Sequence, residues 1–139
     1  MQDAPGFLRA VLSRQDHALV VDLVRERSFQ LHPVKPISDG IAVDPADEIL
    51  ANKLTAIVGR AEERDLVDVF LLERAGFRVE EALPAALKKD GGCTPATLAW
   101  LLSEVRIPDE LELAGDVHSD DLRAWLDELV RRLRRAALP

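Results

Sequence analysis

The stretches EILANKLTAIV (residues 48–58) and RDLVDVFLL (residues 64–72) decide how this chain folds, because each has the apolar spacing of a helix. In the first stretch, the apolar positions 49, 50, 54, 57 and 58 form one face, and Lys53 falls on that face. In the second stretch, bulky apolar residues flank Asp68 on both sides. A buried charge is costly unless it is paired or used. Two such charges on consecutive helices predict a site.

Helix start and stop signals divide the chain after residue 43 into five predicted helices. Three of the predicted starts have a capping residue or a proline, and most of the predicted ends have a glycine nearby. We expect helices from Asp44-Pro45 to Gly59, over residues 63–74 before Gly76, over residues 79–89 with a kink or break at Pro84, from Thr94-Pro95 onward, and from Ser119 onward.

The first forty residues have the composition of strands and turns. Residues 7–12 and 18–24 are rich in β-branched and bulky apolar residues, and the polar residues 13–16 separate them. We expect an antiparallel pair there. Residues 25–40 are polar and contain two prolines, which predicts a connection with one short strand near residues 29–31. Since a lone hairpin is marginal in water, the helices or a larger sheet should cover it.

These patterns predict an α+β fold that is mostly α. Residues 1–43 are expected to form a partial antiparallel sheet, and residues 44–139 a separate bundle of four to five helices. The bundle core should contain the side chains on the apolar stripe of each helix, namely Leu54, Ile57, Phe70, Leu71, Leu98, Leu101, Leu126 and Leu129.

Composition limits the classes of function. The formal net charge of −7 and the absence of tyrosine disfavour a general nucleic-acid binder, which needs a basic face and stacking aromatic residues. The basic run at residues 131–135 is interpreted as cations at a helix C-terminus, with contact to phosphate as the less favoured alternative. Cys93 is the only cysteine, and no apolar run is long enough to cross a membrane. We therefore expect a cytoplasmic protein without membrane partners.

Asp22 is a third charge in an apolar setting, because strand alternation places it on the same face as Val20 and Val24. One interpretation is a salt bridge with Arg9, Arg25 or Lys53. The other is a metal-binding carboxylate at the mouth of a sheet, where Mg²⁺ takes one or two acids together with phosphate oxygens.

The helix charges also have two interpretations. The stem of Lys53 can lie over apolar surface with its amine in water, Asp68 can pair with Lys53 or Arg64, and Arg60 and Arg64 can simply be solvated. Together, however, an acid on a strand, a lysine on one helix and an acid on the next are typical of a phosphate-handling site. This interpretation predicts that Asp22, Lys53 and Asp68 converge in space.

These residues resemble the AbiEii/AbiGii toxin family of nucleotidyltransferases. The resemblance is carried by VDP (residues 43–45), EILANKLTA (48–56), Arg60 and RDLVDVFLL (64–72), with further likeness in KKDGG (88–92), TPATLA (94–99) and VVDLV (20–24). A helix lysine followed by an Arg-Asp-x-x-Asp helix is its central motif.

The resemblance implies a polymerase β-like nucleotidyltransferase that uses Mg²⁺ to transfer a nucleoside monophosphate from a nucleoside triphosphate to an acceptor, an RNA in the toxins. It implies that Asp22 is a metal ligand, that Lys53, Arg60 and Arg64 bind the nucleotide, and that Asp68 and Asp65 are catalytic. The family also has a Gly-Ser turn followed by an Asp-x-Asp-type pair, and the 139 residues contain neither.

The leading hypothesis is a truncated member of the family that retains the helical half and is inactive alone, with Mg²⁺ bound only when a missing N-terminal segment completes the site. One remaining metal-site acid cannot position ions for in-line transfer. The alternative is a non-catalytic helical module that binds a cognate antitoxin or another protein partner.

Overall fold

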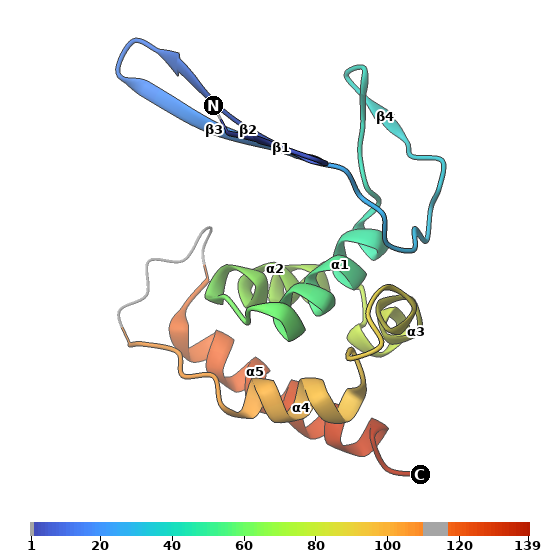
Figure 1. The fold of residues 1–139 in the computed structure, drawn as a ribbon. Helices are drawn as coiled ribbons and strands as arrows, with labels where there is room; N and C mark the ends of the chain where they lie inside the picture. Colours follow the sequence, from blue (N-terminus) through green and yellow to red (C-terminus); the bar gives the residue numbers. More distant parts are fainter. Residues whose placement is uncertain (1, 110–116) are drawn as a thin grey trace.

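The computed structural model describes residues 2–109 and 117–139. In that part of the chain it contains five α-helices, one three-stranded sheet and one two-stranded sheet, so the fold is α+β and mostly α (Figure 1). The prediction of the fold class is confirmed. The strands all precede residue 43 and the helices all follow it, although the division into two domains remains a prediction.

The larger sheet has the order β1-β2-β3 and is antiparallel throughout, with β1 at Gln2–Ala4, β2 at Phe7–Arg14 and β3 at His17–Val24. The predicted pair of strands is confirmed and is longer than expected, because the turn needs only two residues. Gln15, in that turn, has a φ of 53°, in the left-handed region that tight hairpin turns require. Strand β1 was not predicted.

The connection after β3 contains a second small hairpin, β4 at Ile37–Ser38 and β5 at Ile41–Ala42. The strand expected near residues 29–31 is absent, and this prediction was wrong. The turn residues Asp39 and Gly40 have φ values of 51° and 79°, as an Asp-Gly hairpin turn requires. The sequence signal for this hairpin is therefore the turn.

The helices follow their predicted bounds closely: α1 at Ala46–Gly59, α2 at Glu63–Arg74, α3 at Val79–Lys89, α4 at Pro95–Ser103 and α5 at Ser119–Ala136. Thr94 caps α4 as expected, accepting a hydrogen bond from the Thr97 N–H at 3.1 Å. Asp44 and Ser119 do not cap, because Pro45 and His118 occupy the cap positions. Helix α3 continues through Pro84, so of the kink or break predicted there, the break does not occur.

The five helices share a core at the centre of the bundle. Six of the eight predicted core side chains are buried, namely Leu54, Ile57, Phe70, Leu98, Leu126 and Leu129. Leu71 is exposed and Leu101 is half-buried, so these two predictions were wrong. In α2, Val67 and Phe70 face a smaller cluster with Val117 and Leu122, and that orientation turns Leu71 outward.

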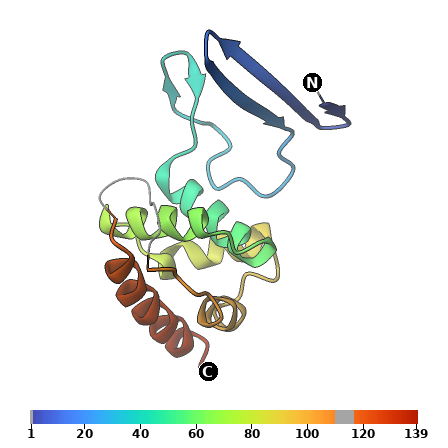
Figure 2. The ribbon, with the colours of Figure 1, turned by 90° about the vertical axis from the view of Figure 1, so that its left-hand side faces the viewer.

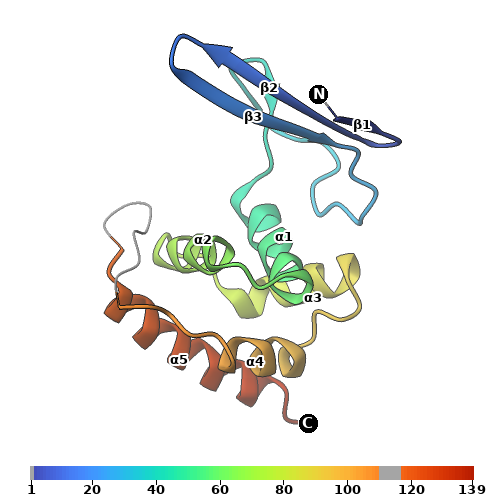
Figure 3. The same cartoon turned by 60° about the vertical axis from the view of Figure 1, so that its left-hand side comes forward.

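The three-stranded sheet stands apart from the helices, and none of the five helices in the described residues covers either of its faces (Figures 2 and 3). Residues 25–45 connect the two parts, and their first half lies against α1 and α3. Lys89 donates a hydrogen bond of 2.5 Å to the carbonyl of Phe29, and His32 pairs with Asp47 at 2.7 Å. The segment is thus fixed to the bundle by polar contacts.

Candidate functional site

Lys53, on α1, reaches across to α2 and forms ion pairs with two acids of that helix. Its Nζ is 3.0 Å from Oδ1 of Asp65 and 2.6 Å from Oδ2 of Asp68. The Lys53 side chain is 23% exposed and points toward the neighbouring helix α2, whereas it was expected to point toward the strand that carries Asp22. Burial lowers the pKa of Lys53, but its contacts with Asp68 and Asp65 outweigh burial and raise that pKa above its usual value. Lys53 is therefore a fixed, cationic group.

Asp65 is the fully buried member of the cluster. Beside its contact with Lys53, it accepts hydrogen bonds from the Arg60 guanidinium at 2.9 and 3.1 Å. Burial raises the pKa of this carboxyl, but the hydrogen bonds from Arg60 and Lys53 outweigh burial and hold that pKa below its usual range. Two cations occupy both oxygens of Asp65. Asp65 can therefore hold the ammonium group of Lys53 in position.

Asp68 and Arg64 are more open to water. The Asp68 side chain is 44% exposed, and the described residues within ion-pair distance of it include only Lys53. Arg64 contacts Glu62 at 2.6 Å, and Glu62 also lies 3.7 Å from Arg60. The structure brings Lys53, Asp65, Asp68 and Arg60 together and joins Arg64 to them only through Glu62.

The predicted convergence is wrong for Asp22, which pairs with Arg9 instead of joining Lys53 and Asp68. It faces Arg9 across β2 and β3, and its two carboxylate oxygens accept hydrogen bonds of 2.6 and 2.7 Å from that guanidinium. The hydrogen bond and charge of Arg9 lower the pKa of Asp22. Asp22 is thus paired within the sheet, as the salt-bridge interpretation held, while Lys53 and Asp68 do converge.

The fit to a resident metal ion is poor. Within residues 2–109 and 117–139, no group of three or more His, Cys, Asp or Glu side chains is placed to hold one. The acids available are already engaged, Asp22 by Arg9 and Asp65 by Lys53 and Arg60. These residues therefore do not form a Mg²⁺ site by themselves.

A second buried charge cluster surrounds Glu48 and was not predicted. Glu48 is fully buried, forms ion pairs with Lys89 and with Lys35 at 3.2 Å, and accepts the His32 backbone N–H at 2.8 Å. Burial raises its pKa, yet these partners lower the pKa to about 2. In the structure, Glu48 lies on the same helix face as the buried Ala51, three residues further along α1.

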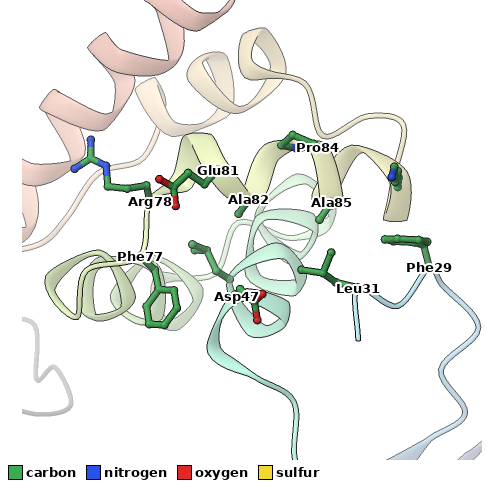
Figure 4. A pocket seen from close by; sticks show the side chains of 11 residues that line it. Phe29, Leu31, Asp47, Phe77, Arg78, Glu81, Ala82, Pro84 and Ala85 are labelled. Atoms are coloured by element: carbon green, nitrogen blue, oxygen red, sulfur yellow. The ribbon is translucent and has the colours of Figure 1, made fainter. Parts of the chain in front are cut away.

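A cavity of about 280 Å³ lies between the connecting segment, α1 and α3 (Figure 4). Phe29 and Leu31 line it from the connecting segment, and Ala82, Pro84 and Ala85 line it from α3. It shares no lining residue with the Lys53 cluster. The cavity and the charge cluster are therefore separate features.

No helix of the described residues is long and apolar enough to cross a membrane. The family model described as "Nucleotidyl transferase AbiEii toxin, Type IV TA system" matches residues 6–137, which is nearly the whole chain. The chain therefore belongs to the AbiEii nucleotidyltransferase toxin family, and the resemblance seen in its motifs is confirmed. Neither the curated proteins nor the solved structures contain a match.

Proposed function

We propose that this chain supplies the helical half of an AbiEii-type nucleotidyltransferase site, in which Lys53 contacts the phosphates of a nucleoside triphosphate. The observation that carries the proposal is the position of Lys53 Nζ between two carboxylates of α2, inside the region that matches the family. A lysine kept cationic and partly shielded from water is suited to binding a triphosphate.

The neighbours of Lys53 have different tasks in this proposal. Asp65, held by Arg60, positions the ammonium group and does not touch the substrate. Asp68 is the more exposed partner, so an incoming phosphate can take its place on Lys53. Arg64, at 69% exposure, adds positive charge at the rim of the site.

The reaction proposed is transfer of a nucleoside monophosphate to RNA. The acceptor hydroxyl oxygen bonds to the α-phosphorus, the bond from that phosphorus to the pyrophosphate oxygen breaks, and the hydroxyl proton passes to a base. Asp68 is our candidate base, because its carboxylate becomes free when phosphate engages Lys53. Asp65 then acts as a positioning residue, because it holds Lys53 and does not touch the substrate.

Transfer also needs groups outside these 139 residues, which contain no Gly-Ser dipeptide and no Asp-x-Asp. We propose that a segment with that turn and acid pair completes the site, brings the Mg²⁺ requirement, and gives Asp22 a metal-facing role once Arg9 is displaced. Alone, the chain would be inactive. A cytoplasmic location belongs to the same proposal.

A second candidate function is a non-catalytic module that binds a cognate antitoxin or another protein. The exposed aliphatic side chains of β2 and β3 favour it, since such surfaces mark protein contacts. The two candidates differ in their need for Lys53. A binding module tolerates loss of that ammonium group, whereas a nucleotidyltransferase does not.

Titration of the isolated chain with a nucleoside triphosphate, followed by backbone amide NMR shifts, tests the phosphate contact. We expect weak, saturable shifts at residues 53, 60 and 68, because a single lysine and its arginine neighbours grip the phosphates. Lys53→Gln should abolish them. Lys88→Gln, which removes an exposed lysine of α3, is the matched control and should retain them. Shifts that survive Lys53→Gln would remove Lys53 from the site.

A further inference from the structure

Residues 29–35 of the connecting segment form a strap that has no secondary structure of its own. Among the described residues, residues 26–35 make no backbone-to-backbone hydrogen bond. Phe29, Leu31 and Val34 are all exposed, although the first two line the cavity between the strap, α1 and α3 (Figure 4). Backbone pairing therefore does not hold the strap, and apolar packing holds it only in part.

A buried ion pair of the bundle holds the backbone of the strap at two points. Glu48 of α1 pairs with Lys89 of α3, and their side chains are 0% and 2% exposed. Glu48 accepts the His32 N–H at 2.8 Å, and Lys89 donates to the Phe29 carbonyl at 2.5 Å. Lys35, 3.2 Å from Glu48, adds a third contact from the strap. The pair thus offers an acceptor and a donor to backbone groups of the same short segment.

The contacts of the strap are concentrated on this one pair. Salt screens a buried pair of charges much less than an exposed pair, so these contacts are the strong ones. The contact of His32 with Asp47, at 2.7 Å, lies nearer the surface and adds less. Loss of the contacts with Glu48 should therefore release the whole strap rather than one residue of it.

The strap also carries the sheet, because only residues 25–28 separate it from the end of β3. The Arg25 N–H donates to the carbonyl of Gly6 at 2.8 Å. Glu26 accepts the N–H groups of Arg27 and Ser28 at 2.8 and 2.6 Å, which makes this link compact. In Figure 2 the sheet stands away from the helices, on the far side of the connecting segment. A sheet attached in this way moves with the strap.

We propose that Glu48 and Lys89 form a latch for residues 29–35, and that opening of this latch frees the strap and the sheet together while the helices stay folded. The chain then has two states, and only the latched state fixes β3 relative to α1 and α2. Opening of one such unit costs less free energy than complete unfolding. Lys53 takes no part in the latch, so the latch can fail its test while the proposed function stands, and the reverse.

Native-state amide exchange, followed by NMR, tests the latch at the His32 N–H. We expect this amide to exchange about tenfold or more slowly than in an unstructured peptide of the same local sequence. Low concentrations of urea should leave its rate unchanged, whereas they should speed exchange in the middle of α5, which opens only by complete unfolding. No protection at His32, or the same urea dependence as α5, overturns the proposal.

Glu48→Met removes the acceptor and should bring the His32 amide close to the peptide rate. Lys35→Met removes a contact from the strap and leaves the buried pair in place, so it tests the latch even if Glu48→Met does not fold. It should speed exchange at His32 about threefold or more. Glu128→Gln, on the half-exposed ion pair of α5, is the control and should change nothing. Exchange at His32 that Lys35→Met leaves unchanged overturns the proposal.

Spin labels on Ser13→Cys in β2 and Arg134→Cys in α5 measure the position of the sheet by electron paramagnetic resonance. Cys93 is fully buried, and burial raises the pKa of its thiol to about 11, so it does not take up the label. We expect a narrow distribution of distances that Lys35→Met broadens and Glu128→Gln does not, with helical circular dichroism unchanged. A distribution that is equally narrow, or equally broad, with and without Lys35→Met overturns the proposal.

Discussion

At the scale of single residues, Asp65 and Asp68 lie three positions apart on α2 and have different surroundings. Asp65 is fully buried against two cations, whereas the side chain of Asp68 is 44% exposed and, among the described residues, forms an ion pair with Lys53 only. Burial fixes a charge in place, and exposure lets it exchange partners. One of the two acids is therefore fixed in place, and the other is free to exchange partners.

Asp65→Asn should lower the free energy of unfolding by about 2 kcal/mol, because the charge-assisted hydrogen bonds of a buried carboxylate are lost. Asp68→Asn should leave the stability almost unchanged. Urea unfolding followed by circular dichroism measures both. Equal losses for the two variants would contradict the separate tasks we assign to these acids.

Glu48 makes the stability depend on pH. The pKa of Glu48 in the folded chain is about 2, below its ordinary value of 4.5. Between these two pH values, the unfolded chain binds a proton at Glu48 that the folded chain does not. This stabilisation is complete above pH 5 and is lost as the pH falls toward 2. Glu48→Gln should remove about 3 kcal/mol at pH 7, since it leaves the buried Lys89 unpaired, and should flatten the loss of stability in acid.

Glu128→Gln is the matched control, because Glu128 is also ion-paired but lies half-exposed on α5. It should change neither the stability at pH 7 nor its decline in acid to a measurable extent. Thermal unfolding of the three proteins between pH 3 and pH 7 would show the difference. If the stability of Glu48→Gln falls in acid as much as that of the unsubstituted chain, other carboxylates cause the fall.

At the scale of elements, the sequence predicted the helices better than the connections. The bounds of α2 and α3 follow from periodicity and glycine stops, and the start of α4 follows from a capping threonine and a proline. The sequence also predicted that Lys53 and Asp68 lie together, because each is a charge on the apolar face of its helix. The pairing of Asp22 could not be chosen from sequence, because three cations were eligible and only the strand register places Arg9 opposite.

Amide exchange should separate the hairpin from the helices. The bundle has a shared core of buried residues, whereas residues 7–24 have water on both faces. We expect amides of β2 and β3 to exchange faster than those in the middle of α1, α2 and α5. Hydrogen exchange followed by mass spectrometry measures this directly. Slower exchange in the hairpin than in the bundle would contradict a self-sufficient helical half.

At the scale of the whole molecule, a stable bundle presents a lysine and an acid at one side and an uncovered sheet at some distance from it (Figure 3). The connecting segment is held to the bundle through Glu48, whereas the sheet itself stands apart from the helices.

Nucleotide transfer to RNA tests this account most directly. Incorporation of a labelled nucleotide from a nucleoside triphosphate is measured for the 139-residue chain and for its fusion to an N-terminal segment with the Gly-Ser turn and acid pair. We predict no transfer by the chain alone and clear transfer by the fusion, reduced on the order of 10² or more by Lys53→Ala or Asp68→Ala and unchanged by Lys88→Ala. Robust transfer by the chain alone, or a fusion indifferent to the loss of Lys53 and Asp68, would contradict the account.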